Sequence, residues 1–129
     1  MQKLILLAPA IDPENEKTYK IAYLAKVPLL QKLIPAPLLM AAAEKFKHVA
    51  ELEKLKLEWK NLKVMVDYFH GTNDWIVPYA NLQFAQKHFI HAQAEFVTLP
   101  GANHFINFFP KKEIVASFLE WLQATKKGK

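Results

Sequence analysis

Two polar side chains in this sequence have the types and the spacing that acid–base catalysis requires. Asp74 follows the apolar run Leu62–Phe69, and His104 follows the apolar run Ala94–Leu99, thirty positions further along the chain. An aspartate that accepts a hydrogen bond from the Nδ1–H of a histidine leaves Nε2 free to take a proton from a nucleophile. The pair therefore predicts an acid and a base that could activate a nucleophile.

The elements around this pair predict an α/β fold. Apolar runs rich in valine and aromatic residues indicate strands, and apolar residues at three- and four-residue steps indicate helices. The predicted strands are Lys3–Pro9, Leu62–Phe69 and Ala94–Leu99, and the predicted helices are Leu38–Lys60, Pro78–Phe89 and the segment from Pro110 onward. Short connections indicate βαβ units, and hence about three parallel strands with flanking helices. Ligands bind at the carboxyl ends of such strands, where Asp74 and His104 are expected.

The length and composition indicate one domain, residues 1–129. Of the 129 residues, 52% are hydrophobic and 22% are charged, which is typical of a globular chain with a single core. The net charge is +5, but all seventeen basic residues are lysines and they are spread along the sequence. Because nucleic-acid readers rely on arginine for bidentate contacts to guanine and phosphate, we expect no nucleic-acid partner.

The sequence also argues against membrane spans, thiol chemistry and metal sites. The apolar stretch 21–43 contains Lys26, Lys32 and three prolines, so we expect no transmembrane segment, and the lack of a targeting segment favours a cytoplasmic protein. The absence of cysteine excludes a thiol nucleophile and a Cys-based zinc site. His88 and His91 have a spacing that can bind a metal ion, but no carboxylate stands at a matching step, so we expect no metal.

Three segments resemble the C-terminal half of the α/β-hydrolase family. HGTNDWIVP at 70–78 resembles the acid-bearing loop of the family, and LPGANHF at 99–105 resembles its histidine loop. LILLAPA at 4–10 resembles the strand that follows the nucleophile helix and leads into the cap. The order and spacing of the three segments agree with the family, and the similarity covers nearly the whole chain.

The resemblance implies roles for the pair and a division of the chain. By resemblance, Asp74 is the catalytic acid, His104 is the general base, and Asp12–Lys60 forms a helical cap over a substrate pocket, with a core at about 61–129. The implied activity is that of a serine esterase, which hydrolyses an ester or related acyl compound through a Ser-His-Asp triad and needs no cofactor. A small hydrophobic ester would suit such a site.

The sequence departs from the family at the nucleophile. The family's serine lies in G-x-S-x-G on a strained turn, and no such motif occurs here. The chain has one serine, Ser117, which lies inside the predicted final helix, where a small packing residue is expected. The segments that hold the family's oxyanion donors are also missing. We therefore expect a chain that is inactive alone and that acts on its substrate only together with a serine-bearing half.

Two other functions fit the same residues. In the family, the strand at Lys3–Pro9 pairs with the strand that carries the nucleophile, and without that neighbour it has unpaired N–H and C=O groups. The chain could then be a non-catalytic binding or assembly module that forms a homo-oligomer through this edge. A small intact enzyme, in which Asp74 and His104 act as an acid–base pair on another substrate, is the third possibility.

Three further polar residues have less specific signals. Asp12, before Pro13, favours a turn at the entrance of the cap over a role as an alternative acid. Asp67 lies within a predicted strand, where we interpret it as an edge group or a hydrogen-bonded group. His70 is predicted to fill a structural position in the turn before Gly71.

Two groups of apolar residues each have two possible interpretations. The aromatic residues Phe105, Phe108 and Phe109 either line an acyl pocket or pack in the core. The apolar residues of the cap either face a hydrophobic substrate or pack against the missing half. These cap residues are Ile21, Leu24, Val27, Leu29, Leu30, Leu33, Ile34, Leu38, Leu39 and Met40.

Overall fold

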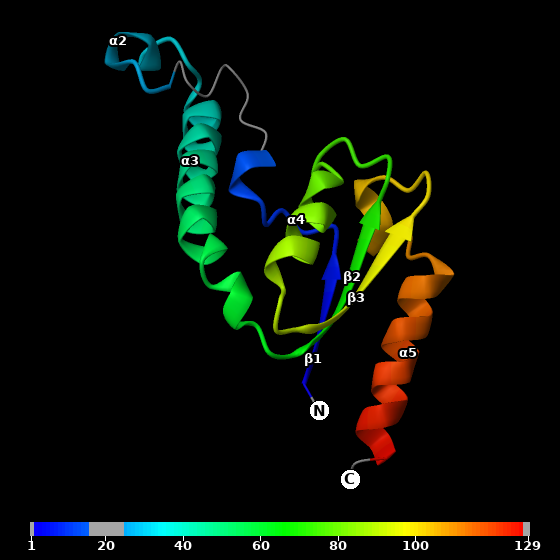
Figure 1. The fold of residues 1–129 in the computed structure, drawn as a ribbon. Helices are drawn as coiled ribbons and strands as arrows, with labels where there is room; N and C mark the ends of the chain where they lie inside the picture. The colour runs from blue at the N-terminus through cyan, green and yellow to red at the C-terminus, as the bar shows by residue number, and fades with distance from the viewer. Residues whose placement is uncertain (1, 16–24, 128–129) are drawn as a thin grey trace.

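The computed structural model describes residues 2–15 and 25–127, which form a parallel sheet with helices on both faces (Figure 1). Strands β1 (Lys3–Leu7), β2 (Met65–Gly71) and β3 (Gln93–Leu99) lie in the order β1-β2-β3. The helices are α2 (Pro28–Gln31), α3 (Ala36–Lys56), α4 (Ala80–His88) and α5 (Lys112–Lys127), with 3₁₀ helices η1 (Pro13–Asn15), η2 (Trp59–Asn61) and η3 (His104–Asn107). The prediction of an α/β fold with three parallel strands and flanking helices is confirmed.

The second strand differs from the prediction at both ends. β2 begins later than predicted, at Met65, and continues through Gly71. The prediction that His70 lies in a turn was therefore wrong, because His70 is inside the strand. The imidazole fits there because it stacks on the ring of Tyr68, with an interplanar angle of 14°. In the register of the sheet, Gly71 is the partner of Leu99, so β2 and β3 end at the same level.

The strands place their side chains alternately into two apolar layers. On the first face, Val66 and Tyr68 of β2 pack with the buried α4 residues Leu82, Phe84 and Ala85 and with Phe89, which follows the helix. On the second face, Phe69 of β2 packs with the buried residues Ala8, Leu99, Ala102, Ile106 and, from α5, Ile114. The central strand is buried from Val66 to Gly71, whereas all five residues of the edge strand β1 are only half-buried.

The cap-like region extends beside this sheet (Figure 1). α3 packs on η1, and the Nζ of Lys56 at its C-terminal end lies 2.6 Å from Oε1 of Glu14. Most of the apolar side chains that were predicted to belong to a cap, and that the structure describes, are exposed, among them Val27, Leu29, Leu33, Leu38 and Met40. Ile21 and Leu24 lie outside the described residues. Within residues 2–15 and 25–127, no helix has the length and apolar character needed to span a membrane.

Candidate acid–base site

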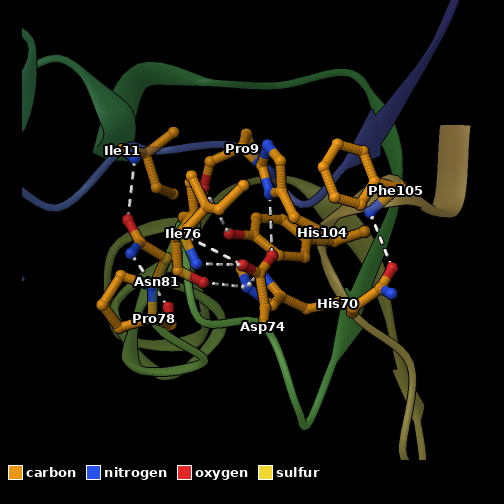
Figure 2. A network of polar contacts seen from close by, with 12 residues as sticks. Pro9, Ile11, His70, Asp74, Ile76, Pro78, Asn81, His104 and Phe105 are labelled. Carbon is orange, nitrogen blue, oxygen red and sulfur yellow. Dashed lines mark hydrogen bonds and ion pairs between the residues drawn. The ribbon is translucent and has the colours of Figure 1, made fainter.

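Asp74 and His104 meet at the carboxyl ends of β2 and β3 (Figure 2). The Nδ1 of His104 lies 2.9 Å from Oδ2 of Asp74. Since an ionised carboxylate only accepts hydrogen bonds, Nδ1 must carry the proton, and Nε2 of the neutral ring is then the basic nitrogen. The Asp74 side chain is fully buried, whereas the His104 side chain is 29% exposed. The structure therefore brings together the two predicted site residues, with the acid inside and the base within reach of a ligand.

The other carboxylate oxygen of Asp74, Oδ1, binds backbone groups of the loop in which Asp74 lies. Oδ1 accepts hydrogen bonds from the backbone N–H groups of Ile76, at 3.0 Å, and Val77, at 2.8 Å. Such hydrogen bonds are typical of an aspartate that forms a turn after a strand. The turn-forming role and the hydrogen bond with His104 are compatible, because each uses a different oxygen of the carboxylate.

Hydrogen bonds join the loop that carries His104 to the loop that carries Asp74. The N–H of Thr72 donates to the carbonyl of Leu99, and its hydroxyl accepts from the N–H of Gly101. The N–H of Asn73 donates to the carbonyl of Ala102 at 3.0 Å. Gly101 has a φ of 69°, a left-handed conformation that glycine adopts without the strain of a side chain. These hydrogen bonds fix the distance between the two loops and hence between the acid and the base.

The segment after β1 is held beside the site by Asn81, which sequence reasoning did not identify. The buried amide of Asn81 accepts from the N–H groups of Ile11, at 2.8 Å, and Asp12, at 2.9 Å, and donates to the carbonyl of Pro78 (Figure 2). The only signal in the sequence was an asparagine in the first turn of a helix. Asp12 itself accepts from the backbone N–H of Glu14, so its predicted turn is confirmed.

The chain's only serine makes its hydrogen bond away from this pair. The buried hydroxyl of Ser117 donates to Oδ2 of Asp67, and Nζ of Lys3 lies 2.5 Å from the same oxygen. Asp67 pairs in register with Ile5 of β1, on the sheet face that α5 covers. The interpretation of Asp67 as a hydrogen-bonded group is confirmed, and Ser117 packs within a helix as predicted.

The aromatic residues after His104 are exposed. Phe108 is 70% exposed and Phe109 is 76% exposed, so the interpretation that they pack in the core was wrong. Phe105 and Phe109 line an open cavity of about 280 Å³ together with Asn103 and Lys111. The ring of Phe108 lies beside that of Phe105, at a centroid distance of 6.3 Å, but this contact leaves Phe108 largely exposed.

His88 ends α4, and His91 lies in the turn after this helix. In the described part of the chain, no three His, Cys, Asp or Glu side chains are grouped so that they could hold a metal ion. The Nδ1 of His88 donates to the carbonyl of Phe84 in the preceding turn of α4, so this nitrogen is engaged within the helix.

No protein-family model and no curated protein matches the chain.

Proposed function

We propose that the chain supplies the acid and the base of a Ser-His-Asp triad, as the acid- and histidine-bearing half of a serine hydrolase of the α/β-hydrolase type. The observation that carries this proposal is the 2.9 Å distance between His104 Nδ1 and the fully buried Asp74 carboxylate. The order of the two residues and their place at the carboxyl ends of neighbouring parallel strands support it.

In the proposed reaction, each group has one role. Nε2 of His104 takes the proton from the hydroxyl of a serine on a partner segment, and that oxygen attacks the ester carbonyl. The protonated His104 then gives its proton to the departing alcohol, which leaves an acyl-serine. His104 next takes a proton from a water molecule, whose oxygen attacks the acyl-serine carbonyl, and returns this proton to the serine oxygen as the carboxylic acid is released. Asp74 keeps the ring in the required tautomer throughout and stabilises the imidazolium.

The chain alone lacks the nucleophile of this machinery. Ser117 is 8% exposed and bonded to Asp67, so it cannot serve as the nucleophile. No G-x-S-x-G motif is present to replace it. We therefore propose that the substrate, a small and hydrophobic ester, is hydrolysed only when a serine-bearing segment completes the site. The exposed Phe105 and Phe109 suit an apolar acyl group.

Labelling with a fluorophosphonate, which reacts with activated serines, tests the proposal. We expect no label on the chain alone. We expect label when it is co-produced with a segment that is encoded beside it and contains G-x-S-x-G, and the label should lie on that segment. A serine hydroxyl reacts poorly when no general base activates it. The label should therefore disappear when the His104→Ala variant replaces the wild-type chain.

Two outcomes would contradict the proposal. One is label on Ser117 of the isolated chain. The other is label on the partner serine that is unchanged by His104→Ala, because the partner would then use a base of its own. A matched control is His91→Ala, which removes an exposed histidine from the turn before β3 and should leave the label unchanged.

A second candidate function, assembly through β1, has its own supporting observation. β1 pairs only with β2 among the described residues, and its Lys3–Leu7 segment is half-buried throughout. An apolar edge strand with open N–H and C=O groups is a template for pairing with another chain. On this proposal the protein is a homo-oligomer joined at β1.

Sedimentation velocity tests the assembly proposal. We expect the wild-type chain to show a dimer whose population rises with concentration. Ala8 donates its N–H to Phe69 of β2, and because successive N–H groups alternate in direction, Ile5 points its own N–H to the open edge. Ile5→Pro should therefore block pairing and give a folded monomer, since proline is tolerated at an edge position that faces away from the ladder. A wild-type chain that stays monomeric at all concentrations would refute assembly.

A further inference from the structure

His70 lies next to the acid of the candidate site, and the proposed reaction gives it no role. Its side chain is fully buried. Its Nε2 lies 3.1 Å from the carbonyl oxygen of Val77 and 3.6 Å from Oδ2 of Asp74. The rings of His70 and His104 thus both approach the same carboxylate oxygen (Figure 2), one from the inside of the protein and one from the exposed side.

The hydrogen bond with Val77 determines the protonation of the His70 ring. A carbonyl oxygen can only accept, so Nε2 must carry a proton. Nδ1 is buried and has no hydrogen-bond partner in the part of the chain that the structure describes. Burial lowers the pKa of His70 below its ordinary value, so the neutral ring is favoured. His70 is therefore a neutral imidazole with its single proton on Nε2.

The orientation of this ring is fixed by its aromatic neighbours. Tyr68 stacks on it at a centroid distance of 6.1 Å and an interplanar angle of 14°. Tyr79 presents its edge at 5.9 Å and 89°. A ring held in this way can direct its N–H at one acceptor with little further loss of rotamer entropy.

Val77 connects His70 to the acid. Its N–H donates to Oδ1 of Asp74 at 2.8 Å, and its C=O accepts from His70. Both polar groups of this residue are therefore engaged, which fixes the turn that holds the carboxylate. If His70 could no longer donate its N–H, the buried carbonyl of Val77 would have no partner, and the turn would be free to move toward one.

We propose that His70 is a positioning residue, whose Nε2–H holds the Asp74–Val77 turn so that Asp74 keeps His104 in the Nδ1–H tautomer. This inference rests on the proposed function for its significance, because only that tautomer leaves Nε2 available as the base. Its geometry can be tested on the chain alone, without a serine-bearing partner, so the two proposals can fail separately.

The tautomers of the two rings are the direct test. Nitrogen-15 NMR of the ring nitrogens assigns each tautomer in a buffer of about pH 9, well above the ordinary histidine pKa of about 6.5. In the wild-type chain we expect Nε2–H for His70 and Nδ1–H for His104. In His70→Phe, which keeps an aromatic ring but removes the donor, the ratio of Nδ1–H to Nε2–H in His104 should fall roughly fivefold, the factor that corresponds to one net hydrogen bond. His70→Gln, which can place an amide N–H near the same point, should retain most of the wild-type ratio.

A control must show that a loss of stability alone does not change the His104 tautomer. Leu82→Ala removes a buried side chain from α4 without removing a donor to the turn, and it serves as the destabilised control in which the His104 tautomer should not change. An unchanged His104 ratio in a folded His70→Phe would overturn the proposal. If His70→Phe fails to fold, the wild-type spectrum still decides, because a His70 with its proton on Nδ1 could not donate to Val77 and would overturn it as well.

Discussion

Lys3→Met is expected to lower the free energy of unfolding by about 3–5 kcal/mol, as is typical when one partner of a buried ion pair is removed. The side chain of Lys3 is 11% exposed and that of Asp67 is 9% exposed, and Nζ lies 2.5 Å from Oδ2. Without the ammonium, the hydroxyl of Ser117 would be the one remaining donor to the Asp67 carboxylate among the residues that the structure describes. A buried charge with one neutral partner is costly, so the folded state is destabilised by more than the ion pair itself contributes.

Urea denaturation followed by circular dichroism measures this effect, with the m-value checked for a common unfolded state. Lys87→Met is the matched control, because Lys87 is an exposed lysine of α4 and its replacement should change stability by no more than about 0.5 kcal/mol. The double variant Lys3→Met with Asp67→Leu should recover most of the stability, since a well-packed apolar pair is often as stable as a buried ion pair. A single Lys3→Met variant within about 1 kcal/mol of the control would show that Asp67 does not depend on Lys3.

This ion pair also shows where prediction from sequence reached its limit. Asp67 in an apolar strand was recognisable as a group that needs a hydrogen bond, because an unpaired carboxylate is rare in such a place. Its partners were not recognisable. Lys3 is far from it in the sequence, and the register of β1 against β2 decides whether the two side chains lie on one face. In the same way, the rotation of α5 about its own axis decides whether Ser117 faces Asp67.

The Asp74–His104 pair could be predicted because its geometry follows from local patterns. Two apolar runs of strand type, joined by one helix, form neighbouring parallel strands, and residues just beyond the strand ends then lie at one edge. The contribution of His70 could not be predicted in this way. Its ring is positioned by Tyr68 and Tyr79, and the relevant acceptor is a backbone carbonyl that sequence patterns do not reveal.

The exposed aromatic residues were mispredicted for a different reason. Composition predicts that phenylalanine is buried on average, but it does not say whether a neighbouring element is there to cover it. Phe108 and Phe109 follow η3 and are largely exposed, although the ring of Phe105 lies beside that of Phe108. If the proposed function is correct, a serine-bearing segment would cover these two side chains, and the same segment would pair with the open edge of β1.

Gly71→Ala is the second variant for which we expect a large loss of stability, and it also disturbs the candidate site. A Cβ on Gly71 would lie 2.1 Å from the carbonyl oxygen of Ala102 and 2.6 Å from its carbonyl carbon. Both are backbone atoms of the loop that carries His104, so no side chain can rotate away. The end of β2 and this loop must separate, which strains the hydrogen bond between Asn73 and Ala102. We expect the free energy of unfolding to fall by about 3 kcal/mol or more, at the upper end for overpacking in a dense interior.

Gly101→Ala provides the matched control for this prediction. A Cβ at Gly101 would meet no atom within 4 Å, but the residue has a φ of 69°, so the cost is that of a left-handed alanine, about 1–2 kcal/mol. Urea denaturation should rank Gly71→Ala as the less stable variant. NMR of the His104 ring should show that the hydrogen bond to Asp74 is broken in Gly71→Ala and intact in Gly101→Ala. The opposite ranking would mean that the loop moves aside easily. In that case the spacing of acid and base would not depend on the tight packing of β2 against the histidine loop, and the hydrogen bonds of Thr72 and Asn73 would have to maintain it alone.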